Sequence, residues 1–227
     1  MVLEGYINIV IEGNEETFKN KAQTKVLDEE DLFRLYCEKI FIDFFHLVDI
    51  NSSMSREIGE CKHIVYQISS LFKFYERTFS LVEFDWIESY AHAAKILKSS
   101  TNSGIVKVDI KGTRVSDGLD IFHMEVAGPL YNVNDKHIAD DTKKTMRTDI
   151  LNLITILRNH LDCLLNLATK IRVYSILSIN ARLTLYSLSM LNNGRFLISE
   201  LATAVIPFSF NGRSQYKHVL RLMAILH

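Results

Sequence analysis

The stretch RVSDGLDIFHMEVAGP, Arg114 to Pro129, contains two acidic residues whose carboxylates could bind a metal ion. They are Asp117 and Glu125, and seven residues separate them. Carboxylate oxygens that converge on one point hold a hard divalent cation such as Mg²⁺, and a nearby lysine can then orient or deprotonate a water for phosphodiester hydrolysis. The two acids therefore raise the hypothesis of a metal-dependent hydrolytic site.

The spacing of the two acids argues against an intact site. If 117–125 were one continuous strand, Asp117 and Glu125 would stand ~26 Å apart at ~3.3 Å per residue. They converge only if Asp117 lies on a bend at Gly118, so that the acids fall on adjoining strands. In addition, the residue two positions after Glu125 is Ala127 and not a lysine.

A lysine from the following helix could replace the missing one, and Lys136, Lys143 and Lys144 are the candidates. The alternative needs no metal. In that interpretation Asp117 caps the turn with Gly118, and Glu125 either faces solvent or pairs with a helix lysine. We favour this second interpretation from the sequence, and it leaves the two acids as candidate remnants of a catalytic site.

Four basic residues accompany the helix after this stretch: Lys143, Lys144, Arg147 and Arg158. Arg158 falls on nearly the same helix face as Arg147, so the set could follow a phosphate backbone. Basic residues near a helix N-terminus oppose the helix dipole, which suggests a reason for their presence. A solvated charged face is the plainer explanation.

Hydrophobic periodicity predicts the elements that must position these residues. Residues 1–27 are a poorly defined N-terminal extension, with a short strand over 6–13. Residues 28–227 are expected to form a single α/β domain with a core at about 60–210. The expected helices are 28–48, 61–77, 140–168 and 215–226, with one or two helical turns in 91–100; the expected strands are 78–90, 105–110, 119–127, 171–179, 182–190 and 195–206.

The helix expected over 140–168 carries one continuous apolar stripe from Met146 to Ala168. Asp140 or Asp141 would cap its N-terminus, and Asp149 and Asp162 would face solvent. Three strands precede this helix and three follow it. This order predicts a mixed β-sheet with a long crossover helix and with the N-terminal helices packed on the sheet.

From about His63 to the end, the chain resembles the PD-(D/E)XK (restriction-endonuclease-like) superfamily, whose core runs helix, three strands, helix, strand. More closely, it is similar to a set of uncharacterised fungal proteins with a degenerate version of that core. The features that carry the resemblance are the strand around FDW, then RVSDG, MEVAGP, the long helix, the hairpin and the final helix. The resemblance implies that Asp117 stands at the metal-binding aspartate and Glu125 at the acid of the acid-x-lysine motif.

Composition places the chain among ordinary globular proteins, with 48% hydrophobic and 23% charged residues. The net charge of -1 gives no overall attraction to nucleic acid or to an anionic membrane. The start has no secretory pattern, and no apolar run approaches the ~20 residues of a membrane span. Three cysteines without a CxxC motif indicate reduced thiols. We therefore expect a soluble intracellular protein, cytoplasmic or nuclear, without a membrane partner.

A second metal hypothesis concerns zinc. His160 and Cys163 lie one helical turn apart, and Cys61 precedes His63 by two residues, so the four could form a site if their helices met. Nothing in the spacing requires this, and we expect no metal there. Nucleotide-binding glycine motifs and the common hydrolase motifs are missing from the sequence, so we expect no small-molecule cofactor.

The sequence therefore favours a catalytically inactive nuclease-like module that binds nucleic acid or another protein through the basic helix. The alternative from another class is a Mg-dependent nuclease that uses Asp117, Glu125 and a migrated lysine, with Mg as its only cofactor. A third alternative is a scaffold protein or truncated paralogue without a ligand.

Overall fold

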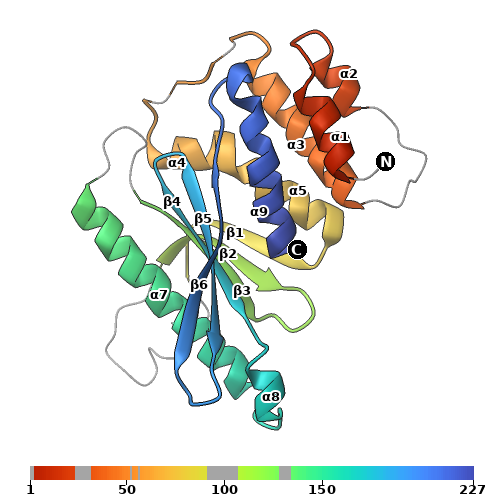
Figure 1. The fold of residues 1–227 in the computed structure, drawn as a ribbon. Helices are drawn as coiled ribbons and strands as arrows, with labels where there is room; N and C mark the ends of the chain where they lie inside the picture. Colours follow the sequence, from red (N-terminus) through yellow and green to blue (C-terminus); the bar gives the residue numbers. More distant parts are fainter. Residues whose placement is uncertain (1–2, 24–31, 52, 56, 91–106, 128–133) are drawn as a thin grey trace. The chain divides into compact units, whose positions relative to one another are not determined.

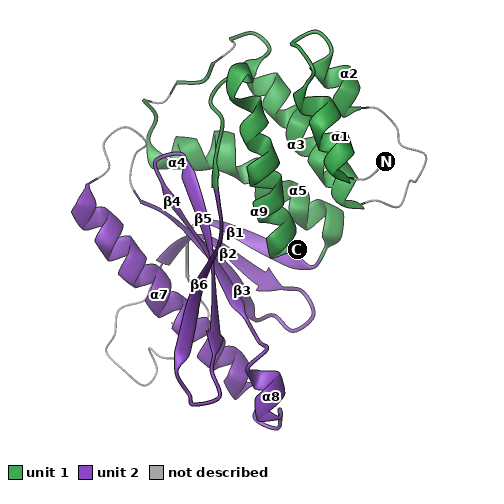
Figure 2. Ribbon diagram, viewed as in Figure 1, with its two compact units in different colours: residues 1–80, 129–131, 204–227 green, residues 81–128, 132–203 purple. Residues whose placement is uncertain are grey.

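The computed structural model describes residues 3–23, 32–51, 53–55, 57–90, 107–127 and 134–227 (Figure 1). The chain divides into two compact units, drawn in green and purple in Figure 2. Unit 1 comprises residues 1–80, 129–131 and 204–227, and unit 2 comprises residues 81–128 and 132–203. The helical turns expected over 91–100 lie outside the described residues. A single domain over 28–227 was expected from the sequence.

Unit 1 is helical. Its elements are α1 (Leu3–Ile11), α2 (Phe18–Ala22), α3 (Leu32–Val48), α4 (Glu60–His63), a π-helical turn (Ile64–Ile68), α5 (Ser69–Phe79), a 3₁₀ turn (Phe210–Gln215) and α9 (Tyr216–Leu226). The helices predicted over 28–48, 61–77 and 215–226 are confirmed in their described parts as α3, α4 to α5, and α9.

The strand predicted over 6–13 is wrong, because Leu3–Ile11 is a helix. Tyr6, Ile7 and Val10 are buried, at helical spacing. The β-branched residues of this segment suggested a strand, but burial of one helical face decides its structure. Phe18 of α2 is also fully buried, with its ring centroid 5.7 Å from that of Phe41. Residues 3–22, expected to be poorly defined, thus contribute to the core of unit 1.

Unit 2 contains a six-stranded sheet in the order β1-β2-β3-β4-β5-β6. The strands are β1 (Val82–Tyr90), β2 (Lys107–Arg114), β3 (Asp120–Val126), β4 (Val173–Ile179), β5 (Arg182–Met190) and β6 (Phe196–Val205). β1–β2, β2–β3 and β4–β5 pair antiparallel, whereas β3 and β4 pair parallel. The predicted mixed sheet is therefore confirmed, and Gly194, at φ +74°, lies in the predicted turn between β5 and β6.

The parallel pair β3–β4 needs a crossover, and α7 (Asp135–Arg158) supplies it. This helix lies against β3, β4 and β5 (Figure 1). An apolar cluster fixes the C-terminal half of α7 to the sheet, formed by Leu119, Leu153, Ile156, Val173 and Leu188. On β2, Gly112 lets the rings of Phe84 and Phe122 approach to 5.8 Å in an edge-to-face contact.

The ends and faces of α7 differ from the sequence prediction. Asn134, and neither Asp140 nor Asp141, is the N-cap, with its side chain accepting from the backbone N–H of Lys136 at 2.8 Å. The helix ends at Arg158, and the short α8 (Leu165–Ala168) is separate. The predicted stripe to Ala168 is therefore wrong beyond 158: Leu161 is 83% exposed.

Asp149, predicted to face solvent, is only 1% exposed. That prediction is wrong because the side of α7 that faces the sheet carries polar residues N-terminal to Leu153. Polar residues therefore do not identify the solvent side of this helix. None of the helices in the described ranges combines the length and apolar character that a membrane crossing requires.

Candidate functional site

The middle of α7, over residues 145–152, meets β3 and β4 through buried polar side chains. We call this set the polar seam; each member is at most 5% exposed, and its members are His123, Glu125, Thr145, Thr148, Asp149, Asn152 and Ser175. Burying polar groups costs free energy unless they are hydrogen-bonded or paired. A seam of this kind beside an apolar cluster is therefore the strongest indication of a functional or specificity-determining region in unit 2.

Glu125 on β3 and Lys144 on α7 form the ion pair of this seam. Lys144 Nζ lies 2.6 Å from Glu125 Oε2, and the glutamate side chain is 2% exposed. Burial raises the pKa of Glu125 to about 8, and the nearby Asp109 and Asp141 act in the same direction, whereas Lys144 lowers it. Burial outweighs the lysine. The other carboxylate oxygen, Oε1, is buried and has no hydrogen-bond partner among the residues described.

The acid that approaches Glu125 is Asp109 on β2. Its Oδ2 accepts a hydrogen bond from the backbone N–H of Val126 at 2.8 Å. The β2–β3 register pairs Ile110 with Met124, so its continuation by one residue places Asp109 opposite Glu125. Directly opposite residues of an antiparallel pair share a face and lie about 4.5–5.5 Å apart at Cβ. Sequence reasoning missed Asp109, because the only signal was an acid within an alternating strand.

Asp117 has a different role. It lies in the turn between β2 and β3, where Arg114 donates to its carboxylate through Nε at 3.0 Å and also through Nη2. The backbone N–H of Leu119 donates to Asp117 Oδ1 at 3.2 Å, and Gly118 has φ +70°. The hydrogen bond from Arg114 is the main cause that lowers the pKa of Asp117.

Asp117 precedes the first residue of β3 and Glu125 is near the last, so the two acids lie at opposite ends of the strand. The interpretation that Asp117 caps the turn with Gly118 and that Glu125 pairs with a helix lysine is confirmed by these contacts. The turn keeps the acids apart because the chain reverses before β3 and not between them.

A second set of buried side chains, formed by His123, Asp149 and Ser175, joins β3 and β4 to α7. Ser175 Oγ on β4 donates to Asp149 Oδ2 at 2.7 Å, and His123 Nδ1 lies 3.4 Å from Asp149 Oδ1. The His123 contact is close but is not aligned as a hydrogen bond. Burial, and secondarily Lys144, lower the pKa of His123 to about 3, whereas burial raises the pKa of Asp149 to about 7.

These shifts favour a neutral His123, and they leave Asp149 partly protonated near pH 7. Sequence reasoning also missed this group. The signal was present in α7: Thr145, Thr148, Asp149 and Asn152 continue the three- and four-residue spacing of Leu153 and Ile156 with polar side chains.

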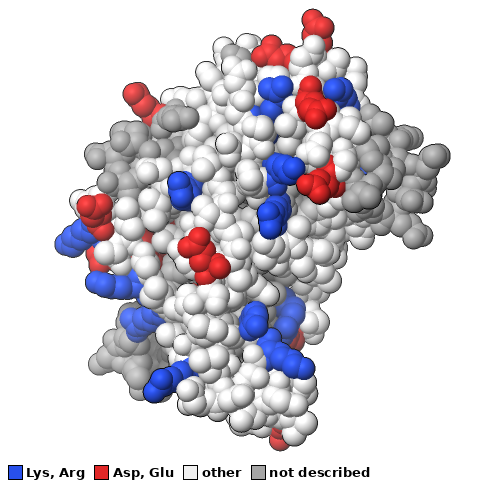
Figure 3. All heavy atoms as spheres, in the orientation of Figure 1, with Lys and Arg blue, Asp and Glu red and all other residues white. Residues whose placement is uncertain are grey.

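The other predicted binding residues lie on the solvent side of α7. Lys143, Arg147 and Arg158 are exposed, whereas Lys144 is turned toward Glu125. Figure 3 shows Lys and Arg side chains recurring along the side of the molecule on which Figure 1 draws α7. The structure thus divides the predicted basic set into three exposed cations and one, Lys144, that pairs with the buried Glu125.

The residues of the zinc hypothesis have separate surroundings. His63 is buried in unit 1, with Nδ1 2.6 Å from Gln67 Oε1. His160 and Cys163 belong to unit 2, and Cys163 Sγ donates to the carbonyl of Leu164 at 3.5 Å. Within the described part of the chain, no three His, Cys, Asp or Glu side chains are grouped so that they could hold a metal ion.

Unit 2 is thus a mixed-sheet α/β unit with one long crossover helix over a buried polar seam. Comparison with models of known protein families, with curated proteins and with solved structures found no match.

Proposed function

We propose that unit 2 is a catalytically inactive, nuclease-like module that binds nucleic acid through the solvent side of α7. The chain order supports this proposal. One helix, α5 at the end of the first segment of unit 1, precedes the three antiparallel strands β1 to β3 of unit 2, and α7 then leads to β4, parallel to β3. This is the order that the resemblance to the PD-(D/E)XK superfamily led us to expect.

The ion pair between Lys144 and Glu125 is the main observation that supports the proposal of a catalytically inactive module. Glu125, the acid expected to hold a metal, already has a cation 2.6 Å away. Asp117, its expected partner, is engaged by Arg114 at the other end of β3. A buried carboxyl with its pKa raised to about 8 and with an ammonium already beside it has less affinity for a divalent cation, because the metal must displace the proton and compete with the lysine.

The binding surface that we propose is the basic face of α7, defined as Lys143, Arg147 and Arg158. Arg147 follows Lys143 by four residues, and Arg158 follows Arg147 by eleven. These steps place the three side chains on one side of a helix with 3.6 residues per turn. All three are exposed. Mobile surface cations neutralise phosphates and release counterions, which favours binding without base recognition. The ligand class is therefore a nucleic-acid backbone.

Retention on immobilised duplex DNA and RNA at about 50 mM salt tests the proposal. The variant Lys143→Ala/Arg147→Ala/Arg158→Ala should bind more weakly. The slope of log affinity against log salt concentration should also decrease, by the equivalent of up to about three phosphate contacts. The matched control is Lys170→Ala/Arg172→Ala/Arg195→Ala, which removes the same charge from other exposed positions of unit 2. Equal loss in both variants, or no retention of the wild type, contradicts the proposal.

A Mg-dependent nuclease is the second candidate, and the position of Asp109 favours it. Asp109 and Glu125 lie on adjoining strands, and Lys144 reaches Glu125 from the helix. When bound, Mg²⁺ would polarise a phosphoryl oxygen or lower the pKa of a water. Asp109 and Glu125 would hold the ion and Lys144 would orient the water. The fit is incomplete, because the described residues provide no third acidic or imidazole ligand in the same group.

Thermal unfolding with and without millimolar Mg²⁺ or Mn²⁺ separates the two candidates, because a ligand that binds only the folded state raises Tm. The inactive module predicts no metal-dependent shift and no cleavage of DNA or RNA. The nuclease predicts a shift that Asp109→Asn and Glu125→Gln abolish and that Asp117→Asn leaves unchanged. The Asp117→Asn variant is the control, since Asp117 lies outside this pair.

A further inference from the structure

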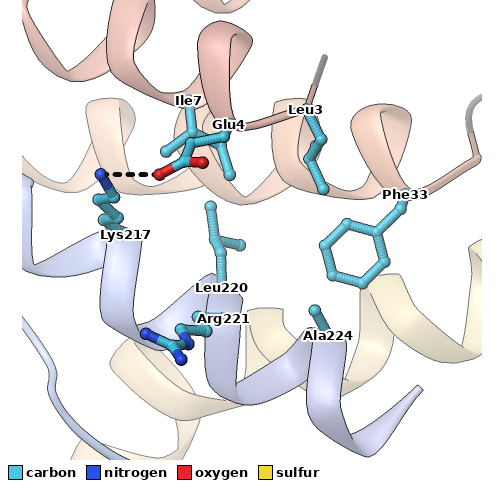
Figure 4. Close-up of a pocket in the computed structure, with 8 residues that line it drawn as sticks. All are labelled: Leu3, Glu4, Ile7, Phe33, Lys217, Leu220, Arg221 and Ala224. Carbon is cyan, nitrogen blue, oxygen red and sulfur yellow. Dashed lines mark ion pairs between the residues drawn. The ribbon is translucent and has the colours of Figure 1, made fainter.

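A cavity of about 350 Å³ opens in unit 1 between α1, α3 and α9 (Figure 4). Its apolar lining consists of Leu3, Ile7, Phe33, Leu220 and Ala224. Ile7 and Leu220 are 7% and 1% exposed, so they form its buried base. A volume of this size is at the lower end of the ~300–1,000 Å³ typical of small-molecule sites.

The aromatic wall of the cavity is held in place. The ring of Phe33 lies 5.3 Å from that of Tyr36 and 5.9 Å from that of His227, between centroids. Tyr36 is fully buried, and its hydroxyl donates to the carbonyl of Leu71 at 2.9 Å. The cavity is therefore largely preformed, which lowers the entropic cost of binding a ligand there.

The rim of the cavity carries an excess of positive charge. Lys217 Nζ lies 3.2 Å from Glu4 Oε1 and donates to Asn8 Oδ1 at 3.4 Å, so its charge is matched by α1 (Figure 4). Arg221 follows one helical turn later and is exposed. Across the described residues, no ion pair or hydrogen bond engages the Arg221 side chain. One guanidinium thus remains available beside the apolar lining.

We propose that this cavity binds a small amphipathic organic anion. Its apolar body would lie against Leu220, Ile7 and Phe33, and its anionic head would contact Arg221. The lining excludes a strongly polar ligand, because the cavity offers few hydrogen-bonding groups away from its rim. The excess charge selects an anion over a cation of the same shape.

Isothermal titration with decanoate as the probe tests the proposal, with decyltrimethylammonium as the comparator of opposite charge. Decanoate should bind measurably more tightly than the cation. Arg221→Glu should weaken decanoate binding by about fivefold or more, since an attraction becomes a repulsion. Ala224→Trp should abolish binding because the indole occupies the cavity.

Two matched controls separate these effects from general changes. Arg77→Glu makes the same charge reversal at another exposed position of unit 1 and should leave the affinity within twofold. Ile225→Trp adds an indole to the same helix, outside the lining, and should also bind normally. Equal binding of the two probes, unchanged binding by Ala224→Trp, or no decanoate binding would overturn the proposal. None of these outcomes depends on the nucleic-acid function of unit 2.

Discussion

Lys144 Nζ of α7 lies 2.6 Å from Glu125 Oε2 of β3, joining a lysine side chain that is 32% exposed to a glutamate side chain that is 2% exposed. The carboxylate cannot recover its lost hydration from solvent, so the lysine is its main source of compensation. The pair thereby connects the crossover helix to the strand that carries the only acid of the MEVAGP stretch. How strongly Lys144 stabilises the charged form of Glu125 therefore decides whether Glu125 is a structural residue or is available for chemistry.

At pH 8, where about half of Glu125 is ionised in the folded chain, replacing Lys144 by Met should destabilise the protein by about 1–2 kcal/mol, less than for a fully buried and fully ionised pair. The loss arises because Glu125 keeps its burial but loses its cation. Urea unfolding followed by circular dichroism measures the free energy of unfolding.

Lys143→Met, at the neighbouring exposed position, is the control and should change that free energy by less than about 0.5 kcal/mol. The double variant Glu125→Leu/Lys144→Met should recover most of the loss, since it removes both charges together. A Lys144→Met variant as stable as the control would show that Glu125 gains nothing from the lysine.

The free energy of unfolding should also depend on pH through Glu125. Its pKa is raised to about 8 in the folded chain, against about 4.3 for an ordinary glutamate. Between these values the folded state binds more protons at this site than the unfolded state does. The stabilisation is therefore complete below about pH 4 and is lost as the pH rises through about 8.

The decrease due to Glu125 should reach about 1 kcal/mol per pH unit between pH 7.5 and 8, where an unfolded histidine is largely deprotonated and Asp149, with its pKa raised to about 7, is mostly ionised. Urea unfolding at several pH values in this window measures the slope. Glu125→Gln should remove most of this slope, whereas Asp117→Asn should not change it, because the pKa of Asp117 is lowered and Asp117 stays ionised in this window. Equal slopes for wild type and Glu125→Gln would assign the dependence to another group.

Ser175→Ala should destabilise unit 2 by about 1–3 kcal/mol, because it removes the buried hydroxyl that donates to Asp149 Oδ2. It should also raise the pKa of Asp149 further, since that hydrogen bond lowers it. Urea unfolding and a carbon-13 NMR titration of the carboxyl measure the two effects.

Ser187→Ala on the neighbouring strand β5 is the control for this substitution. Ser187 is 5% exposed, and its side chain makes no hydrogen bond to any residue that the structure describes. Its replacement should be nearly neutral. If both serine variants lower the free energy of unfolding by the same amount, the hydrogen bond from Ser175 to Asp149 does not stabilise the protein beyond an ordinary buried serine.

Local sequence signals predicted much of unit 2. Alternation predicted β1 and the start of β2, and the glycines at 118 and 194 marked turns because they tolerate positive φ. Pairing register is different, since it depends on contacts between distant segments. For that reason Asp117, next to the visible turn, was singled out, whereas Asp109 opposite Glu125 was missed.

The buried side of α7 shows the second limit of sequence reasoning. Polar residues are mostly exposed, so Asp149 was assigned to solvent. Its burial beside His123 and Ser175 depends on partners that β3 and β4 bring from elsewhere in the chain. The helix end at Arg158 was missed because the apolar spacing continues through Leu161 and Leu164, although the structure leaves both exposed.

Gly112→Ala should destabilise the protein by about 1–3 kcal/mol through overpacking of the sheet face opposite α7. A Cβ at this position would lie 3.0 Å from Phe122 Cβ and 3.0 Å from Phe84 Cε1. The two rings already form an edge-to-face contact, so neither can withdraw without losing it. Gly59→Ala is the control, because a Cβ there meets nothing within 4 Å and Gly59 has an ordinary φ of -70°. Thermal and urea unfolding compare the two variants, and equal stability would mean that the strands can separate to admit a methyl group.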